Sequence, residues 1–591
     1  MRRQLSIHLP VAFFAAACLS WASPGAAQES CSGIFEPSLS ASQRAMLQER
    51  YGVKAGDVRL SPELGLPVLI RMNDHQSLAP KVPRNTVPVR EIHKYDTVIV
   101  GGGPAGLTAA LYLAEAGQRV LVLERNPVMG GLAVGSELKG VRAGGGAAYS
   151  SGPDGGIEYK IFQKIGLGAY KKKLSIPEHI DSYLWKKKLY LGVWEEHSLQ
   201  ELPQSFRLFK HALLKLAAQK AGDTEGPMAE WADGMDMATL VRRMPEIVAT
   251  WKDKESARVL ELFRQDREVP RQDPMKDVID LLDLYGRSAL GGTAREVSAR
   301  QFIDFYESEI YTRYTGTLGT GTIAEALLKK LKSFPNVHLR VSAPVAAIEN
   351  GAQSTRTQFI EDGVLKDVVT DHVVFAAPLS LAPKLIRDFE RQDPEKTAAI
   401  AALKMTDYAV HVVRLKGHPY RATYDTWSES GGDLTKPTDF ILGRWQDPKI
   451  KAYEGTQDFG KNPADDKGVL SIYHPLGASN DKRFSDENQL KLVDHAVKDM
   501  VEKLGPEAAR HGQKIEIELV ESFRWPESIH VVKPGSLKQM PLLARPMGRV
   551  RFANNTVAAP ELETAMGRAY QEAMEILKES AAAGTARASG Q

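Results

Sequence analysis

The chain has 591 residues, and 76 basic against 73 acidic side chains leave a net charge of +3. This length exceeds what one hydrophobic core usually organises, so we expect at least two packed domains with room for a large cofactor. Apolar residues make up 43% and charged residues 25%, which is ordinary for a globular enzyme or binding protein, and the balanced charge argues against a nucleic-acid partner.

The N-terminal residues 1–27 have the pattern of a signal peptide. Arg2 and Arg3 precede an apolar run at residues 11–21, and small residues follow at 25–27. The run is shorter than the roughly 20 residues that span a bilayer, which favours a cleaved signal over a membrane anchor, and we expect no integral span later in the chain. The arginine pair fits either a twin-arginine signal or an ordinary secretory one. A periplasmic or secreted location is therefore expected.

Cysteine usage is sparse. Cys18 lies inside the predicted signal peptide and leaves Cys31 alone in the mature protein, so no internal disulfide is expected. The sequence contains no CxxC or HExxH pattern, and we therefore predict no bound metal.

After a proline-rich extension at residues 28–93, with one helical stretch at 40–51, the predicted core begins with a strand–turn–helix–strand unit. Residues 97–100 are an apolar run typical of a buried parallel strand, and residues 107–116 have helical composition. A second apolar run at 119–123 ends in Glu124.

The turn between the first strand and the helix matches the dinucleotide-binding fingerprint. Gly101 permits a tight turn, Gly103 lets the backbone approach a pyrophosphate, and Gly106 lets the helix pack on the strand. The N-terminus of that helix faces the anion, and Glu124 would accept hydrogen bonds from the ribose. A turn that serves only the chain topology is the alternative, but all elements of the fingerprint occur together.

Residues 126–131, which end in Gly130 and Gly131, resemble the double-glycine extension of FAD enzymes in the amine oxidase, protoporphyrinogen oxidase and phytoene desaturase superfamily. The resemblance extends to residues 140–146, where those families turn beneath the flavin, and over about residues 95–577 in all. It implies FAD as the cofactor. The cofactor-binding residues that it implies, with the fingerprint, are Gly101, Gly103, Pro104, Ala105, Gly106, Glu124, Arg125, Gly130, Gly131, Leu132, Val345, Asn554 and Asn555.

A second glycine cluster at residues 319–323 resembles the return of the chain from an inserted cap into the FAD domain. It could also be interpreted as a nicotinamide site, but residues 309–314 do not form a clean strand and no ribose acid follows. Val345 lies where the family's backbone meets the adenine, although residues 341–348 could equally be a plain core strand.

The closing flavin motif of the family resembles residues 548–556, but it departs at one point. Asn554 and Asn555 stand where the family usually has a glycine and an acid, so an amide would have to replace the carboxylate at the ribityl chain. Trp525, upstream of this motif, is interpreted as a packing residue in preference to a site residue. A final helix is expected at residues 561–579.

The expected fold class is α/β, with a Rossmann-like FAD-binding domain, a second mixed-sheet substrate domain and an inserted helical cap. The boundaries predicted are a signal peptide (1–27), an extension and linker (28–93), three FAD-domain segments (94–156, 319–380 and 546–580), a helical cap (157–318), a substrate domain (381–545) and a disordered tail (581–591).

The catalytic residue is the least visible feature. In many amine oxidases a lysine on a substrate-domain strand holds a water near the flavin, and the matching stretch at residues 408–415, followed by Pro419 and Tyr420, places His411 there. A histidine can accept a proton near neutral pH, so His411 is the candidate catalytic residue. A buried histidine whose hydrogen bonds are satisfied is the competing interpretation.

Three functions remain open at this point. The first is oxidation of a small amine or amino-acid-like substrate by hydride transfer to flavin N5, with oxygen, a quinone or an exported electron carrier as the acceptor. The second is desaturation or isomerisation of an apolar, isoprenoid-like molecule. The third is flavin binding without catalysis. An amine would call for aromatic or acidic groups at the flavin face, and an isoprenoid for a long apolar tunnel under the cap.

Overall fold

The computed structural model describes residues 39–71, 82, 86–152, 156–176, 181–220, 226–311, 313–418, 423–446, 466–480, 485–557 and 559–589. Residues 39–591 belong to one compact unit. The predicted signal peptide, together with Pro419 and Tyr420, lies outside the described residues. Among the described residues, no helix is both long and apolar enough to cross a membrane.

A parallel sheet holds the dinucleotide fingerprint, as predicted. Its strands, in spatial order, are β11 (Val337–Arg340), β5 (Val120–Leu123), β4 (Thr97–Val100), β15 (His372–Phe375) and β21 (Val550–Phe552). Every neighbouring pair is parallel, and all residues of β4 and β5 are buried. This explains why both strands are continuous apolar runs in the sequence.

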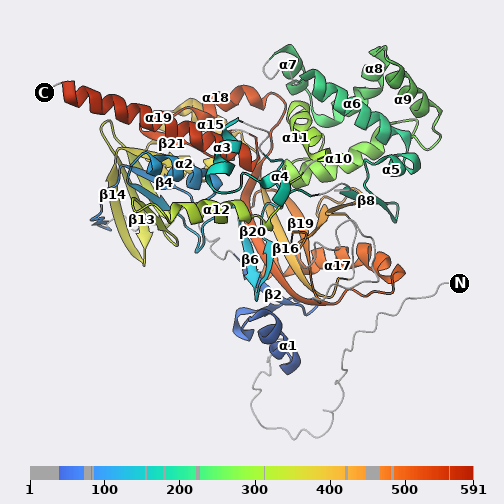
Figure 1. Ribbon diagram of the computed structural model, residues 1–591, viewed down its shortest axis with the longest axis horizontal. Helices are drawn as coiled ribbons and strands as arrows, with labels where there is room; N and C mark the ends of the chain where they lie inside the picture. Colours follow the sequence, from blue (N-terminus) through green and yellow to red (C-terminus); the bar gives the residue numbers. More distant parts are fainter. Residues whose placement is uncertain are drawn as a thin grey trace, which may run out of the picture. The chain divides into compact units, whose positions relative to one another are not determined.

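Three helices pack together on this sheet: α2 (Pro104–Glu115), α12 (Gly321–Leu331) and α19 (Leu562–Ser589). Figure 1 shows α19 running beside α2 at the end of the molecule that carries the C-terminus. The helix α19 continues to Ser589, into the segment from residue 581 that the sequence predicted to be a disordered tail. Alanine-rich sequence after residue 580 has high helix propensity and extends the helix.

An antiparallel sheet and a hairpin complete the cofactor side. The sheet contains β12 (Val345–Asn350), β13 (Thr355–Glu361), β14 (Val364–Thr370) and β3 (Val89–Arg90), and the hairpin is β6 (Gly135–Leu138) with β7 (Val141–Gly144). The short strand β10 (Thr317–Thr320) leads directly into α12.

A nine-stranded mixed sheet forms the second domain. In spatial order it consists of β1 (Arg59–Leu60), β2 (Pro67–Arg71), β20 (Ile517–His530), β16 (Met405–Lys416), β19 (Lys467–Ala478), β18 (Asp439–Leu442), β17 (Asp425–Ser428), β8 (Asp181–Trp185) and β9 (Lys188–Leu191). The long helix α17 (Asp486–Arg510) packs against one of its faces. The sheet therefore recruits strands from the N-terminal extension and from the segment predicted to be cap.

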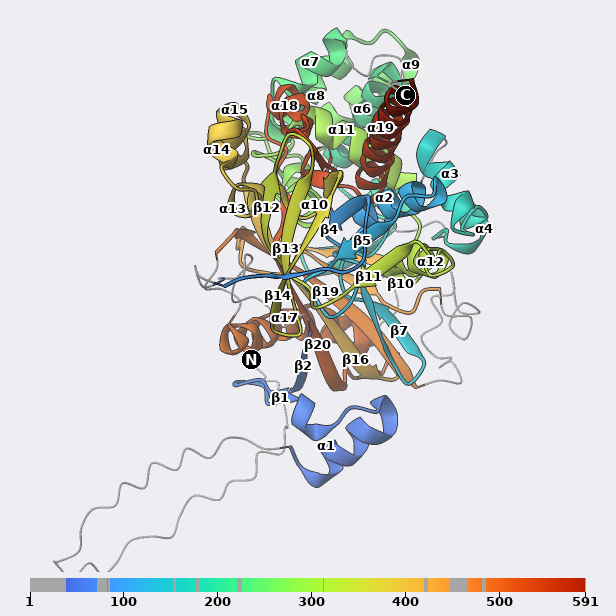
Figure 2. The same ribbon diagram turned by 90° about the vertical axis from the view of Figure 1, so that its left-hand side faces the viewer.

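The N-terminal extension is more structured than a linker. The helical stretch predicted at 40–51 is present as α1 (Ala41–Met46) continued by the π-helical turn η1 (Leu47–Tyr51), and a 3-10 turn, η2 (Ala55–Asp57), follows. β2 then pairs in parallel with β20. This pairing joins residues 39–71 to the substrate domain (Figure 2).

Within the segment predicted to be a helical cap, residues 196–311 are mainly helical. Their helices are α5 (Glu196–Glu201), α6 (Gln204–Lys220), α7 (Pro227–Asp233), α8 (Met237–Thr250), α9 (Lys254–Gln265), α10 (Lys276–Ala289) and α11 (Ala299–Tyr311). These helices gather into one bundle in Figure 1 and share a core with Trp427 of β17. The earlier helices α3 (Gly156–Lys164) and α4 (Tyr170–Lys173) pack on the Rossmann side instead, where Phe162 and Tyr170 contact its core.

The remaining helices also belong to the Rossmann side, although the sequence placed them in the substrate domain. They are α13 (Ala382–Leu385), α14 (Phe389–Gln392), α15 (Pro394–Ala401) and α18 (Met540–Ala544), and 3-10 turns lie at η3 (Leu379–Leu381), η4 (Ser536–Gln539) and η5 (Asn555–Val557). Their core residues, such as Leu385 and Leu543, pack with Phe375 of β15 and Phe552 of β21.

Candidate active site

The glycine turn between β4 and α2 has the geometry that only glycine allows. Gly101 has φ 108°, and a Cβ on it would lie 2.9 Å from the Ala376 carbonyl oxygen. A Cβ on Gly106 would lie 2.0 Å from the carbonyl oxygen of Gly101. Pro104 occupies the first turn of α2, and no side chain caps this helix. The N-terminus of α2 is therefore available to an anionic ligand.

The double glycine forms a second turn that lies on the first. The Gly130 amide donates a 2.8 Å hydrogen bond to the Gly102 carbonyl oxygen, and Gly130 and Gly131 have φ values of 130° and 53°. A Cβ on Gly131 would lie 3.1 Å from the Cα of Gly103. Gly103 itself has open space where a side chain would project, since its nearest neighbour there is 3.8 Å away. That space forms a cradle for a ligand.

Glu124 holds the turn from the end of β5. Its carboxylate accepts hydrogen bonds from the amides of Gly102, at 2.8 Å, and Asn126, at 2.9 Å. Burial raises the pKa of Glu124. The adjoining Arg125 has a buried Nη1 without a hydrogen-bond partner among the described residues. Such a donor is costly to leave unpaired, and a phosphate or ribose oxygen would satisfy it.

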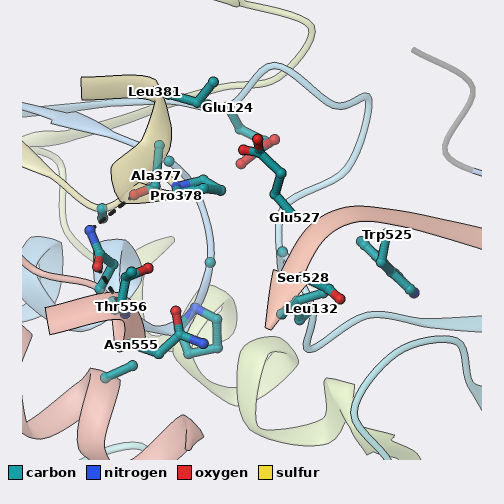
Figure 3. Close-up of a pocket in the computed structure, with 18 of the residues that line it drawn as sticks. Glu124, Leu132, Ala377, Pro378, Leu381, Trp525, Glu527, Ser528, Asn555 and Thr556 are labelled. Atoms are coloured by element: carbon teal, nitrogen blue, oxygen red, sulfur yellow. Dashed lines mark hydrogen bonds between the residues drawn. The ribbon is translucent and has the colours of Figure 1, made fainter. Parts of the chain in front are cut away.

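These groups line a cavity, named here the cofactor cavity, whose walls enclose about 1550 Å³ including the part open to solvent. Its other walls include Val345, Ala377, Trp525 and Asn555. In Figure 3, Ala377, Pro378 and Thr556 lie on one side and Trp525, Glu527 and Ser528 on the other. Of the predicted cofactor-binding residues, those that line it are Gly101, Gly103, Pro104, Ala105, Glu124, Arg125, Gly131, Leu132, Val345, Asn554 and Asn555.

The two asparagines of the closing segment have different environments. Asn554 is buried, and its amide donates to the Ala377 carbonyl oxygen at 3.0 Å and accepts from the Thr556 amide at 3.0 Å. It therefore ties β15 to the closing segment. Asn555 borders both the cofactor cavity and a second pocket beside it. It is the amide that a ligand spanning the two spaces would meet.

That second pocket, named here the inner pocket, encloses about 880 Å³ including the part open to solvent. It shares Leu132, Ala147, Trp525 and Asn555 with the cofactor cavity, so the two spaces adjoin. Carboxyl and aromatic side chains line it. These are Glu309, Asp439, Glu561 and Glu563, with Tyr149, Phe305, Tyr408, Tyr473 and Trp525.

A buried ion network lies behind the inner pocket. The Arg313 guanidinium, fully buried, is 2.8 Å from Asp181 and 3.0 Å from Asp425. It also lies 3.6 Å from Glu309, which accepts a 2.9 Å hydrogen bond from the Tyr285 hydroxyl. One guanidinium thus faces three carboxyl groups and cannot neutralise them all.

Burial is the largest influence on the carboxyl groups of the inner pocket. It raises the pKa of Glu309 to about 7, against the opposing effect of the Arg313 charge, and it raises the pKa of Asp439 to about 7. Burial, reinforced by the charge of Glu563, raises the pKa of Glu561 to about 8. A cation bound in this pocket would favour the ionised carboxylates and lower these values.

The structure places His411, the predicted catalytic residue, outside the lining of the inner pocket. Tyr408 and Val410 of β16 line the inner pocket, whereas His411 projects from the other face of the strand. Its Nδ1 lies 2.9 Å from the Ser522 hydroxyl and its Nε2 3.3 Å from Nδ1 of His474. Burial lowers the pKa of His411 well below its ordinary value. It is a satisfied core histidine.

Sequence reasoning missed several residues of the site. Trp525 was assigned to packing, and it does donate to the Gly145 carbonyl oxygen at 2.9 Å, yet it also lines both spaces. The four pocket carboxyls carry no local motif and come from α11, β18 and the start of α19. The second glycine cluster at 319–321 lines neither space, so the structure gives no support to a nicotinamide site there.

A comparison with protein-family models gives a match that covers most of the chain. The family model described as "Flavin containing amine oxidoreductase" matches residues 104–577. Two curated proteins match only locally, and the chain spans about a sixth or less of their length. It is 61% identical over 41 residues to the thiamine thiazole synthase of Methanococcus vannielii, covering 7% of this chain and 16% of that protein. It is 46% identical over 59 residues to the carotenoid 3,4-desaturase of Haloarcula japonica, covering 10% and 12%.

Among solved structures, a triple mutant of putrescine oxidase has a TM-score of 0.55 at 17% identity and covers 82% of this chain and 99% of its own. The cyclohexylamine oxidase from Brevibacterium oxydans has a TM-score of 0.52 at 18% identity, covering 82% and 99%. At these identities the likeness shows the fold, which is the predicted combination of a Rossmann domain and a mixed-sheet domain.

Proposed function

The chain belongs to the flavin-containing amine oxidoreductase family, and from this premise we propose that it binds FAD in the cofactor cavity and oxidises a small amine held in the inner pocket. The family membership makes it a flavin enzyme. The identity of the flavin and the substrate are the finer parts of the proposal.

The cofactor cavity fits FAD in its shape and its donors. The glycine cradle at Gly103 and Gly131 leaves room for a pyrophosphate at the N-terminus of α2, and the orphaned Nη1 of Arg125 supplies a charged donor nearby. Glu124 would accept hydrogen bonds from the ribose, and Val345 would offer backbone to the adenine. When bound, the flavin would accept the hydride, or its equivalent, from the substrate C–H bond. The protein then has only to bind, orient and deprotonate the substrate.

The observation that favours an amine is the lining of the inner pocket. Glu309, Asp439 and Glu561 offer negative charge, and aromatic rings such as those of Tyr408 and Tyr473 line the same pocket, where a cation can contact them. An isoprenoid carries no charge and no hydrogen-bond donor to offer these carboxyl groups, and burying them against an apolar ligand would favour their neutral forms. An ammonium group would pair with them instead.

Spectroscopy of the purified protein tests this proposal. We expect a bound flavin that releases as FAD on denaturation, and anaerobic addition of small primary amines should bleach its absorbance. Polyenes and other isoprenoids should not. Protein without flavin, or bleaching by polyenes alone, would overturn the proposal. Oxygen, a quinone or an oxidised electron carrier is then added to the reduced protein. The compound that restores the flavin absorbance fastest is identified as the electron acceptor.

We further propose that the protein is exported, on the support of Arg2, Arg3, the apolar run at residues 11–21 and the small residues at 25–27. N-terminal sequencing of protein from a cell fractionation should find the mature chain in the periplasm or medium, starting near residue 28. Recovery of the intact chain in the cytosol would refute export. Substitution of Arg2 and Arg3 by lysine separates the twin-arginine route from the general secretory route, because only the former requires the pair.

A further inference from the structure

Three spaces meet at the beginning of α19. The cofactor cavity and the inner pocket adjoin, and an outer hollow, lined by Ser151, Glu158, Arg568 and neighbouring residues, opens on the other side of the inner pocket. Ser151, Glu561 and Glu563 line both the outer hollow and the inner pocket. Of the carboxyl groups lining these spaces, Glu561 alone borders all three.

We propose that Glu561 is a catalytic residue that accepts a proton from the ammonium group of the bound substrate. This inference rests on the proposed amine oxidation. In the step, an N–H bond of the ammonium breaks, the proton goes to a carboxylate oxygen of Glu561, and the electron pair stays on nitrogen. The products are a neutral amine and a neutral carboxyl group, and neither is oxidised or reduced in this step.

The proton must leave because a charged ammonium resists oxidation at the neighbouring carbon. Loss of a hydride, or its equivalent, from that carbon leaves positive charge, which only a nitrogen with a free electron pair can stabilise. A simple ammonium has a pKa near that of lysine, about 10.4, so it enters the site protonated at neutral pH. A base within reach of both the amine and the cofactor cavity is therefore required.

The other carboxyl groups are less suited to this role. Glu309 and Asp439 line the inner pocket but not the cofactor cavity, and Glu309 is already engaged by Tyr285 and the Arg313 charge. Glu563 lines the pocket but not the cofactor cavity, and it accepts a 3.1 Å hydrogen bond from the Gly152 amide. Glu561 accepts a 2.8 Å hydrogen bond from the Thr564 hydroxyl at one carboxylate oxygen.

The charged surroundings of Glu561 make it a stronger base than an exposed carboxylate. Burial, then Glu563 in the first turn of α19, then Glu309 from α11, raise its pKa to about 8. Glu158 of α3 and Arg568 of α19 also line the outer hollow, and Tyr149 and Asp439 also line the inner pocket. A base with a pKa near the working pH accepts a proton from an ammonium more readily than an ordinary carboxylate does.

The test uses the flavin-loaded protein with two readouts. The first is the rate constant of anaerobic flavin reduction at saturating amine, measured by stopped flow between pH 6 and 9.5. The second is the proton released on binding tert-butylamine, which has no hydrogen on the carbon next to nitrogen and cannot be oxidised, measured by calorimetry in buffers of different ionisation enthalpy. The variants are Glu561→Gln, Glu561→Asp and, as a matched loss of one carboxylate, Glu563→Gln.

We expect Glu561→Gln to lower the rate constant at saturation by about 100-fold or more and to remove its rise with pH, which is the usual scale for losing a general base. Glu561→Asp should recover part of the rate. Glu563→Gln should change mainly the amine concentration needed for half saturation. The proton release of Glu561→Gln should fall below that of the wild type by about 0.9 proton at pH 7 and about 0.1 at pH 9, as a pKa of about 8 requires.

Equal rates and equal proton release in wild type and Glu561→Gln would overturn the assignment while leaving amine oxidation intact. A Glu561→Gln effect confined to half saturation would make Glu561 a binding charge only, which also overturns it. A wild-type flavin that no amine bleaches would instead overturn the proposed function, and this inference with it.

Discussion

Replacing Arg313 by glutamine removes the cation of the buried network behind the inner pocket, and we expect a large, pH-dependent loss of stability. Arg313 lies 2.8 Å from Asp181 and 3.0 Å from Asp425, and all three side chains are buried. Breaking a buried ion pair by removing one partner typically costs about 3–5 kcal/mol, because the other charge stays buried without compensation. We expect Arg313→Gln to lose stability on this scale at pH 8.

The sign of the pH dependence follows from the carboxyl groups left behind. Burial already raises the pKa of Asp181 and Asp425, and without Arg313 both values rise further. An acid whose pKa is higher in the folded than in the unfolded state costs stability as the pH rises above its unfolded value. The deficit of Arg313→Gln should therefore shrink on acidification to pH 5.5.

Urea unfolding of wild type and variant at pH 5.5 and pH 8 measures both effects as changes in the denaturation midpoint. A matched control is Arg414→Gln, which breaks the equally buried pair with Glu521 among residues that line neither space. Glu521 keeps a second cation, Arg71 at 2.8 Å, so this variant should lose less stability than Arg313→Gln and should keep its amine affinity. A deficit of Arg313→Gln below about 1 kcal/mol at pH 8, or one equal at both pH values, would refute the charge argument.

Four further outcomes are expected. Gly103→Val should fold but lose its flavin, because the space at Gly103 is open in the protein and needed by the ligand; flavin content and the thermal midpoint of the flavin-free protein check this. Arg125→Met should weaken FAD binding about 10- to 100-fold in equilibrium titrations, which is the scale of one charged hydrogen bond of 1.5–3 kcal/mol. In His411→Asn, amines should reduce the flavin at the wild-type rate, and a 100-fold slower reduction would make His411 a catalytic candidate again. Finally, the amine KM should fall from pH 6 to pH 8, because Glu309 and Asp439, with pKa values of about 7, ionise over this range while the amine stays protonated; a KM that rises instead would contradict cation binding by these carboxyls.

The cofactor side was readable from the sequence because its signals are local. Gly101, Gly103 and Gly106 are separated by a few residues, and each answers a steric requirement that the structure shows as a backbone contact or an open space. The continuous apolar strands beside them report burial on both faces of a parallel sheet. Such features need no knowledge of distant contacts.

His411 shows where this reasoning fails. Along a strand, neighbouring side chains point to opposite faces, so a prediction displaced by one residue places the wrong side chain in the pocket. The buried run around His411 is apolar on both faces, since α17 covers one and the inner pocket lies against the other. No alternation of polar and apolar residues was left to distinguish them, and the neighbouring residue Val410, with Tyr408, lines the pocket.

The inner pocket could not be predicted from the sequence for a different reason. Its carboxyls, Glu309, Asp439 and Glu561, lie on separate elements and become one electrostatic unit only when the cap, the mixed sheet and the closing helix are in place. As a unit they carry more negative charge than Arg313 neutralises, so the folded protein must either bind protons there or bind a cation. Protonation and amine binding are then competing ways of satisfying the same groups. A non-oxidisable amine should consequently raise the unfolding midpoint more at pH 8 than at pH 6, whereas a pocket built for an apolar substrate would show no such dependence.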